Sequence, residues 1–188
     1  MDVVRSDDAA ARTAAAPLLP PGPPAPRPIA WLGHAVDWSV VLIGATMATL
    51  VFVNVLLHIA HSDIAWTIEF CELLMVWVTF LGGAAATRRG AHMVIGELVG
   101  HLEGAALRFA DAAIQSVVLV TLGLLVWYGI GIADAGRSSE LTVLGWPMAT
   151  QYAALPIASA VTMVFVAWDL LQILIGRTRA ERYGEEHP

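Results

Sequence analysis

The stretch EFCELLMVWVTFLGGAAATRRGAH, residues 69–92, decides how this chain folds. Two acids, Glu69 and Glu72, stand near its start, and two bases, Arg88 and Arg89, stand near its end. The fifteen residues between Glu72 and Arg88 carry no formal charge. As a helix they cover about 22 Å, less than the roughly 30 Å of a bilayer's hydrocarbon core. We therefore expect a short membrane-spanning helix whose charges lie at the two boundaries of the hydrocarbon.

The composition of the whole chain is that of a membrane protein. Of its 188 residues, 57% are hydrophobic and only 14% are charged, whereas a soluble domain carries about 25% charged residues. The net charge is −6, and no basic stripe is present that would neutralise the phosphates of a nucleic acid. Cys71 is the single cysteine, so an intrachain disulfide is excluded.

Hydropathy predicts four membrane-spanning helices, since each crossing needs about 20 apolar residues. These segments are apolar all round rather than along one stripe, which is typical of helices surrounded by lipid or protein. The fold class expected is an all-α integral membrane protein with a four-helix membrane domain over residues 29–176. Its spans are expected at about residues 36–59, 63–87, 112–133 and 149–175.

The distribution of the arginines predicts the orientation of these spans. All ten basic residues are arginines, and nine of them lie before the first span, after the second or after the fourth. Only Arg137 lies in the other set of loops. Because positive charge is retained on the cytoplasmic side, we expect both the N- and the C-terminus in the cytoplasm.

Three segments are expected to lie outside the bilayer core. Residues 1–28 hold seven of the ten prolines, which interrupt any signal-peptide-like apolar run, so a disordered cytoplasmic tail is expected. Residues 177–188 are expected to form a cytoplasmic C-terminal tail. The link between the second and third spans places Val94, Leu98 and Leu102 near one face, which indicates an amphipathic interfacial helix. An extension of the third span into the cytoplasm is the alternative.

The chain offers almost no catalytic chemistry. It contains no nucleophile–base pair, no metal-ligand cluster and no nucleotide-binding motif, so we expect no catalytic residue, no metal, no cofactor and no enzyme activity. None of the six histidines lies in the middle of a span, whereas a bis-histidine haem needs two imidazoles that face each other. This placement disfavours a haem-carrying membrane anchor.

Glu69 and Glu72 are three residues apart and therefore share one helical face near the outer hydrocarbon boundary. One interpretation is that Glu72 carries protons, as intramembrane acids do in small exporters. The other is structural, because acids in the first turns of a helix are favoured by its dipole and can pair at a protein interface. The absence of a second acid near the midplane favours the structural interpretation.

Polar residues near the inner ends of the spans suggest a belt of ion pairs. Asp169 lies about 9 Å inside the expected end of the last span, where an unpaired acid is costly. We hypothesise that it pairs with one of the arginines at similar depth; simple snorkelling of Asp169 to water is the alternative. The other members of the belt would be Asp37, Asp111, Arg88, Arg89 and Arg108.

Small and weakly polar residues indicate contacts between helices. Gly82 and Gly83 precede three alanines and permit close approach of another helix, from a partner or from this chain's own bundle. Asn54 and Gln115 lie within spans and are expected to form hydrogen bonds between helices.

Two stretches together resemble a known family. In IEFCELLMVWVTFLGGAAATRRGAHMVI, residues 68–95, an acidic start is followed by Trp77, FLG with alanines, an arginine pair and His92. In WPMATQYAALPIASAVTMVFVAWDLL, residues 146–171, the last span follows a proline and contains a Y-x-x-L-P element. This order resembles the small membrane subunit, DctQ type, of tripartite ATP-independent periplasmic (TRAP) transporters. The stretch NVLLH departs from the family, which often has an Arg–Tyr-type pair there.

The resemblance, over roughly residues 31–176, implies a division of labour. A large permease subunit of the DctM type would hold the ion and substrate sites, and a periplasmic binding protein would capture a small organic acid. This chain would be a scaffold in the bacterial inner membrane. A redox-enzyme anchor and a self-contained exporter using Glu72 are the alternatives. The interface or orientation residues expected from the resemblance and from the residue arguments are Glu69, Glu72, Trp77, Gly82, Gly83, Arg88, Arg89, His92 and Asp169.

Overall fold

The computed structural model describes residues 26–60, 62, 64–89 and 105–176, and within them the chain is all-helical. The single β-type pairing among these residues is an isolated bridge between Glu140 and Pro147. Four helical segments are long and apolar enough to cross a membrane, which confirms the expected fold class. The elements are α2 (Arg27–Ile59), α3 (Trp66–Arg88), α5 (Ala105–Ala135), the 3-10 turn η2 (Gly136–Ser138), α6 (Ala149–Tyr152) and α7 (Ala154–Ile175).

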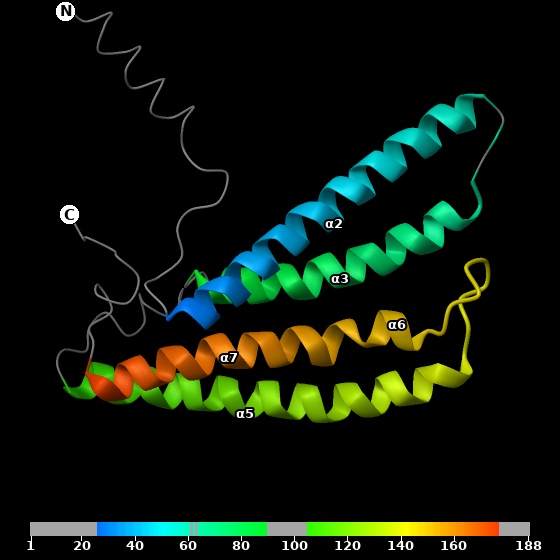
Figure 1. Ribbon diagram of the computed structural model, residues 1–188. Coiled ribbons are helices and arrows are strands. Elements are labelled where there is room, and N and C mark those ends of the chain that lie inside the picture. The colour runs from blue at the N-terminus through cyan, green and yellow to red at the C-terminus, as the bar shows by residue number, and fades with distance from the viewer. Residues whose placement is uncertain (1–25, 61, 63, 90–104, 177–188) are drawn as a thin grey trace, which may run out of the picture.

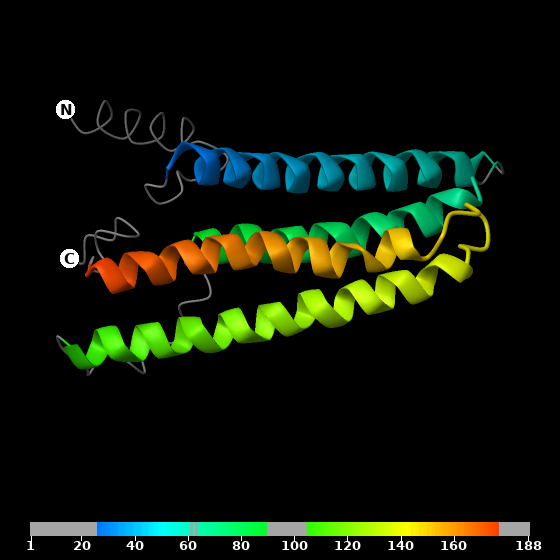
Figure 2. The ribbon, with the colours of Figure 1, turned by 60° about the horizontal axis from the view of Figure 1, so that its bottom comes forward.

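The helices pack in an open order, α2–α3–α7–α5, rather than as a closed ring. Helix α3 packs against α2 and α7, and α7 also packs along α5. In both ribbon views α2 and α5 lie at opposite edges of the assembly (Figures 1 and 2). The edge helices therefore present most of their surface to the surroundings.

The two ends of the helical assembly differ in what they carry. The start of α2 and the end of α7 lie at one end, which we call the terminal end (Figure 1). The opposite end, where α5 connects to α6, is called the loop end. Most of the expected tails and of the expected interfacial helix falls on residues 1–25, 90–104 and 177–188, which lie outside the described residues. The last residues of the expected N-terminal tail, Arg27 and Pro28, are helical and belong to α2.

Two helices start earlier than the apolar spans alone indicated. Helix α2 begins at Arg27 and has 33 residues, so it is about 50 Å long and exceeds the hydrocarbon thickness. Helix α5 begins at Ala105, ahead of the expected start at residue 112. Helical hydrogen bonding continues through these less apolar ends because nothing in the local sequence, such as an internal proline, interrupts it.

The last span is interrupted near its start. Pro156 has no backbone N–H, so it leaves the carbonyl of Tyr152 without its usual helical donor, and the helix is divided at Ala153 into α6 and α7. Gly129 of α5 faces this proline, and a Cβ built on Gly129 would lie 3.0 Å from Pro156 Cδ. The break therefore sits where α5 and α7 approach each other closely.

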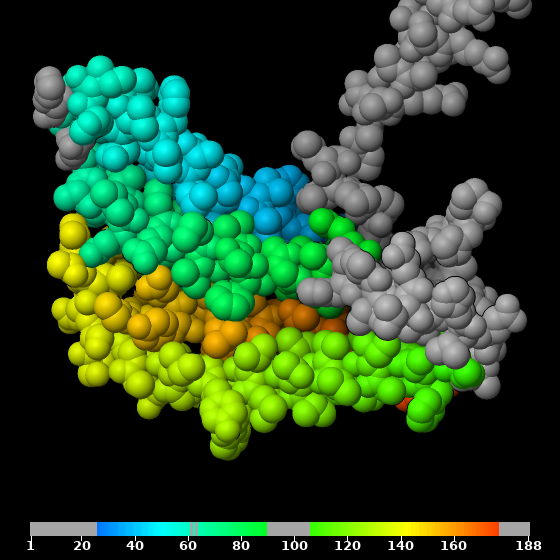
Figure 3. All heavy atoms as spheres, turned by 180° about the vertical axis from the view of Figure 1, so that it is seen from behind, coloured from blue at the N-terminus to red at the C-terminus, as the bar shows by residue number. Residues whose placement is uncertain are grey.

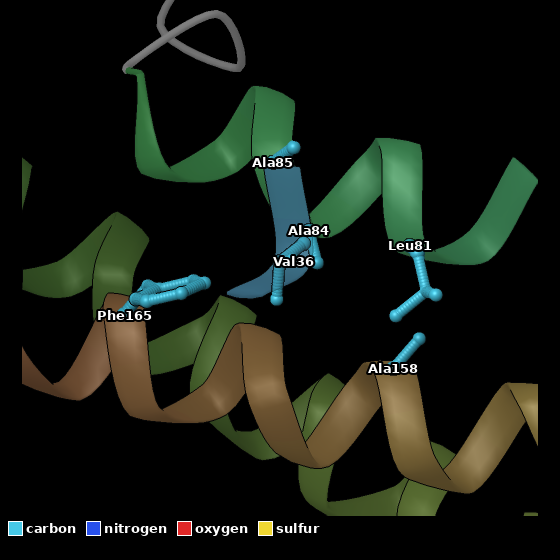
Figure 4. Packing of buried hydrophobic residues seen from close by; sticks show 6 residues of the cluster. All are labelled: Val36, Leu81, Ala84, Ala85, Ala158 and Phe165. Atoms are coloured by element: carbon cyan, nitrogen blue, oxygen red, sulfur yellow. The ribbon is translucent and has the colours of Figure 1, made fainter. Parts of the chain in front are cut away.

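The small core joins three helices. Its buried residues come from α2, α3 and α7, as Figure 4 shows: Val36, Leu81, Ala84, Ala85, Ala158 and Phe165. Alanines allow the helix backbones to approach, which is how helices associate when lipid offers no hydrophobic driving force. In the most apolar stretch of α2 none of the residues is buried, against 33% in α7. So much exposed apolar surface requires an apolar surrounding.

Candidate functional site

Helix α3 carries most of the residues that the sequence singled out, and they divide into three zones. Glu69 lies at the loop end, Glu72 to Gly83 lie along the middle, and Arg88 and Arg89 lie at the terminal end. Each zone has a different set of contacts. His92 falls outside the described residues, so its expected role stays a prediction.

At the loop end, Glu69 holds the connection between α5 and α6. Its Oε2 accepts hydrogen bonds from the backbone N–H groups of Val143, at 2.8 Å, and Leu144, at 2.9 Å. Hydrogen bonds to an ionised carboxylate are roughly twice as strong as those between neutral groups. Glu69 is therefore a structural residue within this chain.

Aromatic side chains reinforce the attachment of this connection. Phe70 makes edge-to-face contacts with Trp66 and with Trp146, at ring-centroid distances of 6.0 and 6.2 Å. Residues 139–148 also fold back on themselves, since Leu141 N–H donates to Trp146 O and Met148 N–H donates to Ser139 O, both at 2.8 Å. We call Glu69, Trp66, Phe70, Trp146 and residues 139–148 the loop clamp.

Glu72 lies one turn farther along α3 and has a different environment. Its side chain is exposed, and within the described part of the chain it has neither a hydrogen bond nor an ion pair. Four further residues at helical spacing are exposed on the same face. We call this set the open face of α3: Ile68, Glu72, Met75, Thr79 and Gly83.

The open face of α3 combines a charge with small and weakly polar residues. A Cβ built on Gly83 would have no atom of the described chain within 4 Å, and the same holds for Gly82. Figure 3 shows α3 uncovered between α2 and α7. A neighbouring helix could approach this backbone closely.

Trp77 lies on the opposite side of α3 and is engaged within the chain. Its indole Nε1 donates a hydrogen bond to the backbone carbonyl of Thr150 in α6, at 3.1 Å, and its ring packs against the core. This bond ties α3 to the segment just before the break at Ala153. Trp77 therefore positions α6 within this chain.

At the terminal end, Arg88 and Arg89 converge on one carboxylate of α2. Arg88 Nη2 donates to Asp37 Oδ2 at 2.5 Å, and Arg89 Nη2 donates to Asp37 Oδ1 at 2.7 Å. The exposed fractions of the side chains are 9% for Arg88, 25% for Arg89 and 4% for Asp37. We call these three residues the arginine cluster; it realises two of the ion pairs of the hypothesised belt.

Gly33 makes room for this cluster. It lies one turn before Asp37 on α2, and a Cβ placed on it would overlap Arg88 Nη1. The guanidinium of Arg88 can therefore lie against the α2 backbone only because no side chain stands there. Sequence reasoning missed Gly33, although its i, i+4 spacing to Asp37 was the available signal.

Asp169 is joined to α5 by a hydrogen bond. Gln115 Nε2 donates to Asp169 Oδ2 at 2.6 Å, so Gln115 forms the bond between helices that its position predicted. Pairing of Asp169 with an arginine stays a hypothesis. Arg108 instead packs on the end of α7, where a Cβ on Gly176 would lie 2.7 Å from its Nη2; a cation is favoured at that helix terminus.

The described residues offer no arrangement suited to redox or metal chemistry. They contain two histidines, His34 and His58, which lie on the same helix about 36 Å apart and so cannot face each other across a haem. No group of three or more potential ligands that could hold a metal ion occurs within the described ranges.

Comparison with known proteins finds sequences similar to this chain. A sequence profile for the DctQ component of tripartite ATP-independent periplasmic transporters matches residues 47–176. The chain is also 27% identical over 137 residues to the sialic acid TRAP transporter permease protein SiaT of Haemophilus influenzae (strain 86-028NP). That match covers 72% of this chain but 21% of the relative, so the chain spans about a fifth of the relative's length.

The profile match covers most of the chain, including all of α3, α5, α6 and α7 and residues 47–59 of α2. It confirms the resemblance inferred from the sequence, and it agrees with the expectation of a transport component rather than an enzyme. The four long apolar helices make the chain a multi-pass membrane protein. The chain belongs to the DctQ family of TRAP transporter components.

Proposed function

We propose that this chain is the scaffold subunit of a TRAP transporter and that its open face of α3 docks on a large permease subunit of the DctM type. The observation that carries the docking surface is Glu72, an exposed acid without a described partner in an apolar helix. A carboxylate that faces lipid is costly, whereas a donor on a neighbouring protein helix would stabilise it.

The rest of the open face supports a protein neighbour over lipid. Thr79 and Gly83 keep this side of α3 thin at its middle, so a second helix can approach closely. Glu69 and Trp77, which the sequence placed among the interface residues, are occupied by contacts inside the chain. The proposed interface is therefore narrower than the one expected from the sequence.

The proposal includes the orientation and the remaining partners. With the terminal end in the cytoplasm of a bacterial inner membrane, Arg27, Arg88, Arg89 and Arg108 lie on the positive side and Arg137 lies opposite. The loop clamp then faces the periplasm, where a substrate-binding protein would deliver a small organic acid. The name of the Haemophilus relative, which refers to sialic acid, supports this substrate class.

Co-expression with the neighbouring reading frames tests the proposal. When a tagged copy of this chain is purified in mild detergent, a large multi-span protein is expected to co-purify with it in a fixed ratio. Uptake in proteoliposomes should then require both membrane proteins and the binding protein. Transport by this chain alone, lost in Glu72→Gln, would instead support the exporter. A Soret absorbance band in the purified chain would support a redox anchor.

A further inference from the structure

The charges of the arginine cluster do not cancel. Among the described residues, two guanidinium groups share the one carboxylate of Asp37, which leaves one positive charge in a site where Arg88 is 9% and Asp37 is 4% exposed. The Nε atoms of Arg88 and Arg89 are also buried, and within the described residues neither has an acceptor. A cluster that is short of negative charge and of acceptors is suited to bind an anion.

Part of the cluster is accessible from outside. Arg89 keeps 25% of its side chain exposed, whereas its contact with Asp37 holds the guanidinium in place. A guanidinium presents its donors in a planar fork that matches two phosphate oxygens. Because the fork is already oriented by Asp37, little side-chain freedom remains to be lost when an anion binds.

The location of the cluster identifies the source of the anion. The uncharged stretch of α3 ends at Thr87, so Arg88 and Arg89 lie where hydrocarbon gives way to headgroups. At the same end of α2 the rings of Trp31 and Trp38 are 73% and 63% exposed, and tryptophan is favoured at this depth of a membrane. The anion most available at this level is the phosphate of a phospholipid.

We infer that the arginine cluster is a binding site for the phosphate of an anionic phospholipid at the terminal end of the assembly. Arg89 contacts the headgroup, Asp37 orients both guanidinium groups, and Gly33 gives Arg88 the space to stay beside them. The residues matched by the family profile begin at residue 47, so Asp37 and Gly33 lie outside the matched region. The inference does not depend on the proposed docking of α3.

Native mass spectrometry of the full-length chain tests the site. The protein is purified in detergent and supplied in turn with phosphatidylglycerol, phosphatidylcholine and inorganic phosphate. We expect selective retention of phosphatidylglycerol and a loss of about tenfold in Arg89→Gln, the effect of one charge-assisted hydrogen bond. Arg137→Gln is the control, because Arg137 is 77% exposed at the loop end, and it should retain the lipid as the unsubstituted chain does.

Asp37→Asn separates a lipid site from an internal ion pair. Asn keeps a side-chain oxygen that can still orient one guanidinium, while loss of the negative charge raises the local charge from +1 to +2, so the folded variant should retain more phosphatidylglycerol. Retention that is unchanged or lower in folded Asp37→Asn would contradict the inference. So would equal retention of both lipids, equal loss in Arg137→Gln, or displacement of the lipid by inorganic phosphate. Retention abolished by the large permease subunit would show that a protein occupies the site instead.

Discussion

At the scale of single residues, the positions of Arg88 and Arg89 at the end of α3 depend on the residues of α2 that lie opposite them. Among the described residues, Asp37 supplies the carboxylate that both arginines contact, and Gly33 supplies the space. Charge pattern alone predicted that the arginines would lie at a membrane boundary. It could not show that two of them share one acid, because that depends on the relative rotation of two helices 51 and 52 residues apart in sequence.

Gly33→Ala should destabilise the protein, although alanine is the better helix former by about 1 kcal/mol. The new Cβ would overlap Arg88 Nη1 and would lie 2.7 Å from Arg88 Cδ. Arg88 can move away only by leaving Asp37, and breaking a buried ion pair costs roughly 3 kcal/mol. Thermal unfolding in detergent measures the difference in melting temperature between Gly33→Ala and the unsubstituted protein.

Gly44→Ala is the matched control for this prediction. Gly44 lies on the same helix, and nothing in the described chain approaches its built Cβ within 4 Å. The melting temperature of Gly44→Ala should equal that of the unsubstituted protein or be slightly higher, because alanine has a higher helix propensity than glycine. Equal melting temperatures for the two variants would show that Gly33 does not serve the arginine cluster.

At the scale of elements, the apolar lengths predicted four spans and the structure has four, but the attachments between them were not predictable. The bond from Glu69 to the Val143 and Leu144 amides joins residues 74 and 75 positions apart. The sequence showed only an acid at a helix start, which serves equally well as a dipole partner. The break at Ala153 was partly foreseeable, since Pro156 was visible in the sequence.

Glu69→Gln should loosen the loop clamp. An uncharged amide oxygen is a weaker acceptor for the Val143 and Leu144 amides, so their hydrogen–deuterium exchange should become about tenfold faster. Glu72→Gln is the control, because Glu72 lies one turn away and does not contact this loop. Unchanged exchange in Glu69→Gln, or equally fast exchange in both variants, would show that Glu69 does not hold the loop.

Close packing between α5 and α7 gives a second prediction at this scale. Gly129→Val would place side-chain atoms onto Pro156, which already lies 3.0 Å from a built Cβ, and overpacking costs roughly 1–3 kcal/mol. Gly131→Val is the control, because its Cβ meets nothing described within 4 Å. A lower melting temperature is therefore expected for Gly129→Val alone; equal decreases would reflect the loss of helix propensity and not packing.

At the scale of the whole molecule, the open order α2–α3–α7–α5 leaves the chain with a small core and two largely uncovered edge helices. Composition predicted a membrane protein, and the four long apolar helices of the described residues agree with that. Apolarity could not predict which helix face contacts lipid and which contacts a protein, since both kinds of face are apolar. The contacts within the chain add what apolarity lacks: Glu69 and Trp77 have internal partners, whereas Glu72 is exposed.

The docking of α3 on a large permease subunit is tested most directly by two matched substitutions in the co-expressed transporter. Gly83→Leu adds bulk to the open face of α3, and Gly123→Leu adds the same bulk to α5; neither built Cβ meets a described atom within 4 Å. Both variants should fold, and the measurement is the amount of large subunit recovered with each tagged chain. We predict a loss of about tenfold or more for Gly83→Leu and full recovery for Gly123→Leu. Full recovery with Gly83→Leu, or a loss confined to Gly123→Leu, would contradict the account.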